Sequence, residues 1–224
     1  MCLDKVTSGR SRRSPTVHRV VGSGCHGRTM ARKKKILLHI GPNPSELART
    51  HDALAAEAPL LETVGYAVAG ATGDQLDAAA HEMLRSHKSA GLKRKDVEGS
   101  WAAACRRIAK AKVDAVVSQP RFCTADGAQI ALIVDALAGL DVHVVATPEE
   151  GEEPDELVAR WSKHLKPGRT HVAPLSADAA AVDLAEELVG IALCLQQRDL
   201  DAKITKLKQR RKLVRHRLAL REAF

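Results

Sequence analysis

The stretch KILLHIGPNPSELA, residues Lys35 to Ala48, decides the fold class of this chain. Its first part, Ile36–Ile40, is short and almost wholly apolar, which is typical of a strand buried on both faces of a sheet. A glycine–proline turn follows, and Ser45 is the predicted N-cap of the next helix. Strand, turn and helix in this order predict the opening unit of an α/β domain, with the turn at a place that suits phosphate binding.

Strand-like and helix-like segments alternate along the rest of the chain. The predicted strands are Ile36–Ile40, Tyr66–Ala71, Asp114–Ser118, Asp141–Thr147 and 171–175. The predicted helices are Ser45–Val64, Asp74–Ser89 capped by Asp74, Ser100–Ala111, Thr124–Gly139 and Leu157–Leu165, with a polar break at Gly91–Gly99. This order predicts a three-layer α/β sandwich with a mostly parallel central sheet, a P-loop NTPase-like topology. Ligands are therefore expected beyond the carboxyl ends of the strands.

Charge divides the chain into an acidic body and two basic ends. The net charge is +8, yet residues 1–35 hold ten Lys and Arg against one acid, and residues 198–224 hold ten against three. Residues 36–197 hold fifteen bases and twenty-three acids. We predict a disordered leader over 1–29, with translation expected to start at Met30, an α/β domain over 30–197 and a basic amphipathic helix over 198–224.

Cysteine use and hydropathy predict a cytoplasmic protein. The five cysteines stand singly, in spacings that suit neither a zinc site nor a disulfide framework, so reduced thiols are expected. Cys105 and Cys194 lie in Ala/Leu-rich helical segments and are predicted to be core residues. No run approaches the roughly 20 apolar residues that a membrane span needs.

The C-terminal helix is the predicted partner-binding element. Apolar residues and two arginines follow a 4,3 spacing from Leu200 to Arg221, which predicts a short coiled-coil seam. The residues expected to contact a partner are Lys203, Lys206, Arg210, Arg211, Arg215 and Arg217. Three interpretations stay open: packing on the acidic body, a homotypic coiled coil, or docking to an anionic partner such as nucleic acid or acidic lipid.

Four segments in order resemble bacterial P-loop sulfotransferase-like proteins. They are KILLHIGP, Trp101 leading into VVSQ, VHVVAT and Trp161, and the resemblance covers roughly Lys35 to Lys166. Such a resemblance implies transfer of a sulfuryl group from the adenosine donor PAPS. It also implies that the turn after the first strand holds the 5′-phosphate and that an Arg after the fourth strand holds the 3′-phosphate.

The chain departs from that family at both phosphate sites. Asn43-Pro44-Ser45-Glu46-Leu47 replace the KTGTT-like segment, so the lysine and the later glycine are gone. Pro44 removes a backbone donor, and Glu46 adds a negative charge where a phosphate would sit. In TPEEGEE, Glu149 stands at the arginine position. We therefore predict a degenerate member that lacks the PAPS-binding motifs and takes no cofactor.

These departures predict a non-catalytic interaction or scaffold protein, a pseudoenzyme whose basic ends contact an anionic partner or, through the last helix, another copy of the chain or a protein partner. The alternative is group transfer with an altered donor site and PAPS as donor. Its catalytic candidates are His39, Ser118 and Arg121, and its cofactor-binding candidates are Gly41, Asn43 and Ser45. A further alternative is non-specific binding of nucleic acid or an anionic surface through the basic helix.

Buried strands and helices also account for several of these residues without any ligand. His39 and His143 lie on apolar strands and are predicted to be hydrogen-bonded core histidines, with no metal site expected. Trp101 and Trp161 are predicted packing anchors.

Overall fold

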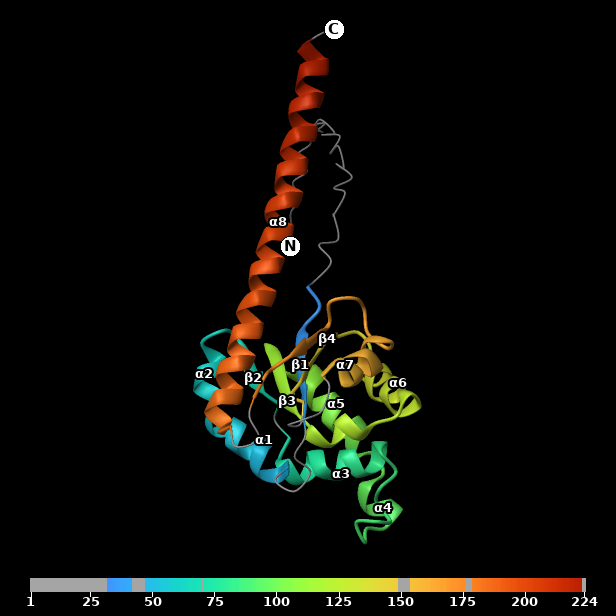
Figure 1. Ribbon diagram of the computed structural model, residues 1–224. Coiled ribbons are helices and arrows are strands. Elements are labelled where there is room, and N and C mark those ends of the chain that lie inside the picture. Colours follow the sequence, from blue (N-terminus) through green and yellow to red (C-terminus); the bar gives the residue numbers. More distant parts are fainter. Residues whose placement is uncertain (1–31, 42–46, 70, 149–153, 176–178, 223–224) are drawn as a thin grey trace, which may run out of the picture. The chain divides into compact units, whose positions relative to one another are not determined.

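The strand β1 (Lys35–Ile40) lies at the centre of a five-stranded parallel sheet (Figure 1). The computed structural model describes residues 32–41, 47–69, 71–148, 154–175 and 179–222. The other strands are β2 (Tyr66–Val68), β3 (Asp114–Ser118), β4 (Asp141–Ala146) and β5 (Thr170–Val172). Their order is β2-β3-β1-β4-β5, and each pair is parallel. The chain leaves β1 toward β2 and leaves β4 toward β5, so the topological switch point lies between β1 and β4.

Helices cover both faces of this sheet and complete three layers (Figure 1). One face carries α3 (Gly73–Met83), α5 (Ser100–Lys110), α6 (Gly127–Asp135) and α7 (Pro154–Ser162). The other carries α1 (Leu47–Ala56), α2 (Ala58–Glu62) and the start of α8 (Ala181–Glu222). Side chains of β1 alternate between the two cores, with Ile36 and Leu38 in the first and Leu37 in the second. The predicted α/β fold class of P-loop-like topology is confirmed.

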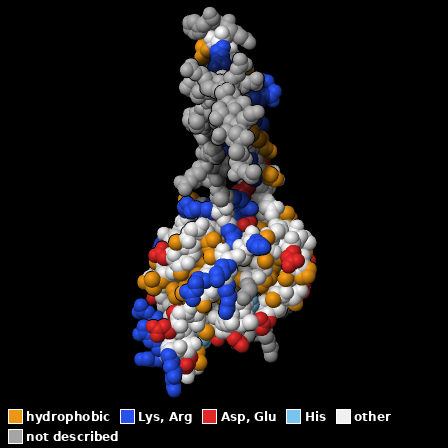
Figure 2. Space-filling model, turned by 180° about the vertical axis from the view of Figure 1, so that it is seen from behind, with side chains coloured by type: hydrophobic (Ala, Val, Ile, Leu, Met, Phe, Trp, Pro, Cys, Tyr) orange, Lys and Arg blue, Asp and Glu red, His pale blue; other side chains and the backbone are white. Residues whose placement is uncertain are grey.

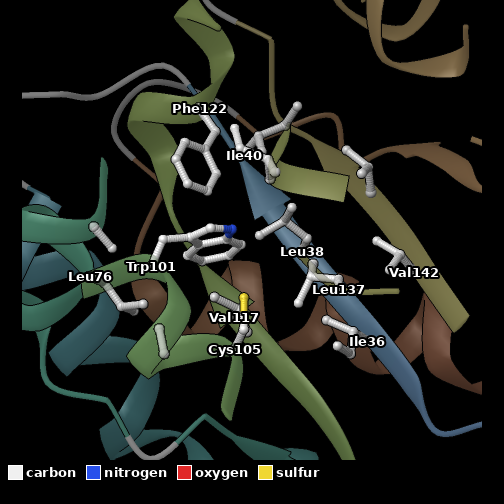
Figure 3. Close-up of a cluster of buried hydrophobic side chains, with 14 of the residues drawn as sticks. Ile36, Leu38, Ile40, Leu76, Trp101, Cys105, Val117, Phe122, Leu137 and Val142 are labelled. Carbon is white, nitrogen blue, oxygen red and sulfur yellow. The ribbon is translucent and has the colours of Figure 1, made fainter. Parts of the chain in front are cut away.

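Both tryptophans lie in the first core, which confirms them as packing anchors. Trp101 and Trp161 are 2% and 0% exposed. The rings of Trp101 and Phe122 meet edge to face, with centroids 5.3 Å apart, and Leu38 and Val117 of the sheet lie near the Trp101 ring (Figure 3). This geometry suits the positive edge and negative face of aromatic rings. Because so few aromatics are available, aliphatic side chains supply the rest of this core.

The predicted helix Ser45–Val64 is two helices, and that prediction was wrong in its extent. α1 ends at Ala56, and α2 begins at Ala58 with a proline in its first turn. Pro59 has no backbone N–H, so it suits a helix start and cannot continue the hydrogen bonding of a preceding helix. The predicted cap Ser45 and the neighbouring Asn43 lie outside the described residues.

The predicted helix Asp74–Ser89 begins earlier and ends sooner. Thr72 caps α3 in a capping box with Gln75, so Asp74 lies in the first turn and is not the cap. The helix ends at Met83 because Arg85 takes a left-handed conformation, with φ 56°. The Arg85 and Ser86 amides then donate to the carbonyls of Glu82 and His81, which is a Schellman ending.

The remaining boundaries shift by a few residues. A short helix, α4 (Arg94–Val97), interrupts the predicted break at Gly91–Gly99. The predicted helix Thr124–Gly139 is a 3-10 helix, η2 (Pro120–Thr124), followed by α6, which Asp126 caps. The predicted helix at Leu157–Leu165 starts and ends three residues earlier, and β5 is shorter than the predicted strand at 171–175.

α8 is a single helix of 42 residues, and it passes position 198 without a break. The predicted basic segment 198–224 is therefore the second half of an element that begins in the body. Its first half packs on the second core through Leu184, Leu188 and Leu195. Cys194 is exposed on this helix, so its predicted core position was wrong, whereas Cys105 is buried as predicted. The predicted leader over 1–29 lies outside the described residues.

Candidate functional site

Three polar side chains meet where the central strands end, beside the topological switch point. His39 is near the end of β1, Ser118 is the last residue of β3, and Thr147 directly follows β4. Parallel strands bring their carboxyl ends to the same edge of the sheet, which is where open α/β proteins bind ligands. We call His39, Ser118 and Thr147 the strand-end cluster.

The strand-end cluster is a hydrogen-bonded chain that runs from Ser118 through His39 to Thr147. His39 Nδ1 lies 2.9 Å from Ser118 Oγ, and His39 Nε2 lies 3.1 Å from Thr147 Oγ1. All three residues are buried, with exposed fractions of 1–5%. A neutral imidazole has one N–H donor and one acceptor nitrogen, so one hydroxyl donates to the ring and the other accepts from it. The structure thus brings the predicted residues His39 and Ser118 together.

Burial keeps the imidazole of His39 neutral. Desolvation lowers the pKa of His39 to about 4. At neutral pH the ring carries no charge, and both of its nitrogens already have hydroxyl partners. The expected hydrogen-bonded core histidine is confirmed in its geometry.

Gly41 adjoins this cluster and has no room for a side chain. A Cβ atom at this position would lie 2.0 Å from Thr147 Oγ1 and 3.0 Å from His39 Nε2. Its φ lies outside the left-handed range, so the need for glycine is steric. The Gly41 amide donates to the Pro120 carbonyl at 3.4 Å. The assignment of Gly41 to phosphate binding stays a prediction.

Arg121 lies near the end of β3 in sequence but pairs elsewhere. Its Nε donates to Asp77 Oδ1 on α3 at 2.8 Å, and Asp77 Oδ2 also lies 3.5 Å from His81 Nε2. A small hollow of about 400 Å³ adjoins this pair, lined by Leu84, Ser86, Arg121, Thr124, Asp126 and Gln129. The structure therefore brings His39 and Ser118 together, whereas the Arg121 guanidinium pairs with Asp77 of α3.

Sequence reasoning missed Thr147 as a member of this region and indicated Gln119 only as part of the strand tip Gln119–Arg121. Gln119 is 1% exposed, and its amide donates to the Leu76 carbonyl at 2.6 Å while its oxygen accepts from the Arg121 amide. Both residues directly follow buried parallel strands, and that position was the available signal.

A pair of histidines lies between β4 and β5. His143 Nδ1 is 3.0 Å from His171 Nε2, and the two rings stack with centroids 5.3 Å apart. Burial, followed by the nearby Arg169 charge, lowers the pKa of His143 to about 3. Arg169 contacts the His143 ring and also pairs with Asp141 at 2.9 Å. His143 is therefore a neutral core histidine, as expected. In the described part of the chain, no cluster of three His, Cys, Asp or Glu residues is placed to hold a metal ion.

The second feature of functional interest is the exposed half of α8. Every residue from 200 to 221 is exposed, the seam residues included. Leu200, Ile204, Leu207, Val214 and Leu218 are 48–62% exposed. The predicted partner-binding residues lie on the same half and are all exposed: Lys203, Lys206, Arg210, Arg211, Arg215 and Arg217. The described structure leaves this half of the helix off the acidic body.

Polar contacts hold the middle of α8 to the body just before the exposed half begins. The ammonium of Lys35 lies 2.6 Å from Asp199 Oδ2 and 3.4 Å from the Leu195 carbonyl. Gln196 Nε2 donates to the Val64 carbonyl at 2.6 Å. The Lys35 side chain is only 4% exposed, so its charge needs these partners.

Basic residues also occur elsewhere on the surface, but with acids among them. Lys and Arg side chains gather around α4, at the lower left of Figure 2. There the consecutive bases Lys93, Arg94 and Lys95 are followed by the exposed acids Asp96 and Glu98. Residues 200–221, by contrast, hold nine Lys and Arg and a single acid, Asp201. Among the described helices, none is both long and apolar enough to span a membrane.

The described residues define a three-layer α/β protein of P-loop-like topology that carries an exposed basic helix. No protein-family model matches the chain, and no curated protein matches it. Among solved structures it is similar to Kti12 from Chaetomium thermophilum in complex with ADP-AlF3, with 12% identity and a TM-score of 0.38. That similarity covers 70% of this chain and 96% of the other. Shared shape at this level says nothing about what this chain binds.

Proposed function

We propose that this protein is a non-catalytic, sulfotransferase-like scaffold that presents the second half of α8 to a partner in the cytoplasm. The observation that carries this proposal is the exposure of every residue from 200 to 221 in a helix continuous with the body. An apolar stripe on an exposed helix is stabilised only when another molecule covers it. The body anchors the helix, and the exposed half makes the contact.

The strand-end cluster supports the non-catalytic part of the proposal. A general base and its hydroxyl must be reached by the substrate, and His39, Ser118 and Thr147 are all buried, with exposed fractions of 1–5%. The sequence also lacks the lysine and arginine that would neutralise a donor's phosphates. The alternative, group transfer at an altered donor site, requires His39, Ser118 and Arg121 to act together, and Arg121 pairs with α3.

Titration calorimetry separates the scaffold from the transferase. The full chain is titrated with adenosine 3′,5′-bisphosphate, the product that PAPS-dependent transfer leaves behind. We expect no heat of binding at millimolar ligand. Binding near micromolar would restore the transferase interpretation.

A second experiment tests the scaffold itself in the native host. Size-exclusion chromatography of a cell extract compares the wild type with a variant carrying Ile204→Glu and Val214→Glu in the stripe. The control carries Ala202→Glu and Gln209→Glu, which lie on the opposite side of the same helix. We expect the wild type and the control to elute in an assembly larger than the purified chain, and the stripe variant to elute at the purified size. Equal elution of all three would contradict the proposal.

A further inference from the structure

The exposed half of α8 carries a seam that suits one partner helix, and Leu213 and Leu220 are exposed outside this seam. Its positions alternate at spacings of four and three: Leu200, Ile204, Leu207, Arg211, Val214, Leu218 and Arg221. On an α-helix this spacing gives the narrow stripe of a coiled coil, whereas a helix packed on a globular core has a wider apolar face. The apolar members are about half exposed, so nothing in the described structure covers them.

The positions that flank this seam are almost all basic. Lys203, Arg210 and Arg217 precede seam residues on one side, and Asp201, Lys208 and Arg215 follow seam residues on the other. In a two-stranded coiled coil such flanking residues face those of the partner helix and determine which partner is accepted. Five of these six side chains therefore need an acid opposite them.

A second copy of this chain is the wrong partner by charge. In a parallel pair, Lys203 would face Lys208 of the other copy, and Arg210 would face Arg215. In an antiparallel pair, each flank would face itself, and the flank of Lys203, Arg210 and Arg217 would again set base against base. Arg211 would also sit inside the seam with no acid to meet it. The chain's own residues 1–31 are excluded for the same reason, because they hold six bases and one acid.

We propose that this seam binds an acidic amphipathic helix of another protein and forms a heterotypic two-stranded coiled coil. The inference rests on the proposed scaffold function and names the chemistry of the partner. The apolar residues of the partner helix pack against the seam, and its flanking Asp and Glu residues pair with the five bases. One acid in its own seam meets Arg211.

Two other anionic partners fit these features less well. A helix that lies on a membrane buries a broad apolar face with aromatic residues, and residues 200–221 contain no Trp, Tyr or Phe. Nucleic acid would neutralise the bases but would leave the apolar stripe in water. An acidic helix uses both features together.

The experiment measures binding of fluorescent three-heptad peptides to the full chain by anisotropy. The first peptide has Leu and Ile in its seam, one Glu in the central seam position, and Glu at all flanking positions. The second keeps the same seam and has Lys at the flanks. The third keeps the Glu flanks and has Ser in the seam. We expect the first peptide to bind at least about 100-fold more tightly than either of the others.

Two variants of the chain make the result specific. We expect a variant with reversed flanking charges to prefer the Lys-flanked peptide. This variant carries Lys203→Glu, Lys208→Glu, Arg210→Glu, Arg215→Glu and Arg217→Glu. Ile204→Ser with Leu207→Ser is expected to abolish binding of the first peptide. Both changes lie where every residue is exposed, so we expect the body to stay folded, and thermal unfolding of each variant checks this.

Several outcomes would overturn the inference. They are equal binding of the first and third peptides, tighter binding to phosphatidylserine vesicles or to duplex DNA than to the first peptide, and a purified chain that sediments as a dimer the first peptide does not disrupt. If the host assembly forms but the peptides are not discriminated, the scaffold function stands and only the acidic-helix partner falls. If no host assembly forms and no peptide binds, both fall.

Discussion

At the scale of single residues, Gly41 shows how tightly the strand-end cluster is packed. We expect Gly41→Ala to lower the free energy of unfolding by about 1–3 kcal/mol, because its methyl group would overlap the Thr147 hydroxyl. Urea denaturation followed by circular dichroism measures this change. A matched control is Gly190→Ala, which lies inside α8 with open space around it and should instead stabilise the chain by up to about 1 kcal/mol.

The steric explanation has its own check in a double variant. Thr147→Ala removes the atom that lies 2.0 Å from the added methyl group. Gly41→Ala should therefore cost less in the Thr147→Ala background than in the wild type, a non-additivity expected of residues in contact. Strictly additive losses would show that Gly41 is required for some reason other than contact with Thr147.

His39 makes stability depend on pH in a defined direction. Its pKa is about 4 in the folded chain against 6.5 for an ordinary histidine, so the unfolded chain binds the proton more readily. The stabilisation is fully present above pH 6.5 and is lost as the pH falls toward 4, by up to about 3 kcal/mol. Burial lowers the pKa of His51, His143 and His171 as well, so they act in the same direction.

Urea denaturation between pH 7.5 and 4.5 tests this contribution. The variant His39→Gln keeps a side chain that hydrogen-bonds but does not titrate. We expect it to be less stable than the wild type at pH 7.5 and to lose less stability on acidification. Parallel curves for the two proteins would mean that His39 is protonated equally in both states.

At the scale of elements, α3 tests whether its cap has been identified correctly. The Thr72 hydroxyl accepts from the Gln75 amide, and the Gln75 side chain accepts from the Thr72 amide. We expect Thr72→Ala to cost about 1 kcal/mol of unfolding free energy, the usual value of such a cap. Asp74 is the cap that the sequence predicts, and Asp74→Asn should lower the free energy of unfolding by no more than a few tenths of a kcal/mol. A larger loss at Asp74 would restore it as the cap.

The same helix shows what the sequence can and cannot predict. The five strands and the helices between them were predictable because apolar runs and helical periods depend on a few neighbouring residues. The end of α3 was not, since Arg85 adopts a left-handed conformation that normally favours glycine. In the strand-end cluster, His39 and Ser118 were predictable from their place at strand ends. The Arg121 pairing with Asp77 was not, because residues 44 positions apart in sequence carry no local signal of contact.

At the scale of the whole chain, one helix joins two kinds of surface. The first half of α8 is apolar toward the body, and its second half presents apolar residues in a basic surround. The helix passes from its packed half to its exposed half at the contact between Lys35 and Asp199, where the start of β1 meets α8. The body therefore determines where the exposed half begins, as the proposed scaffold function requires.

This division predicts two levels of stability along α8. An isolated helix of about 20 residues is marginal in water, because packing supplies most helical stability in proteins. Hydrogen exchange measured by mass spectrometry on the full chain should therefore find slow amides over 184–196 and fast ones over 204–220. Addition of the Glu-flanked peptide should slow exchange over 200–221 and leave the body unchanged. A chain that ends after Asp199 should keep the wild-type unfolding midpoint, since the exposed half buries no residue on the body. Uniformly slow exchange along α8 without any peptide would show that the chain, or a second copy of it, already covers the seam.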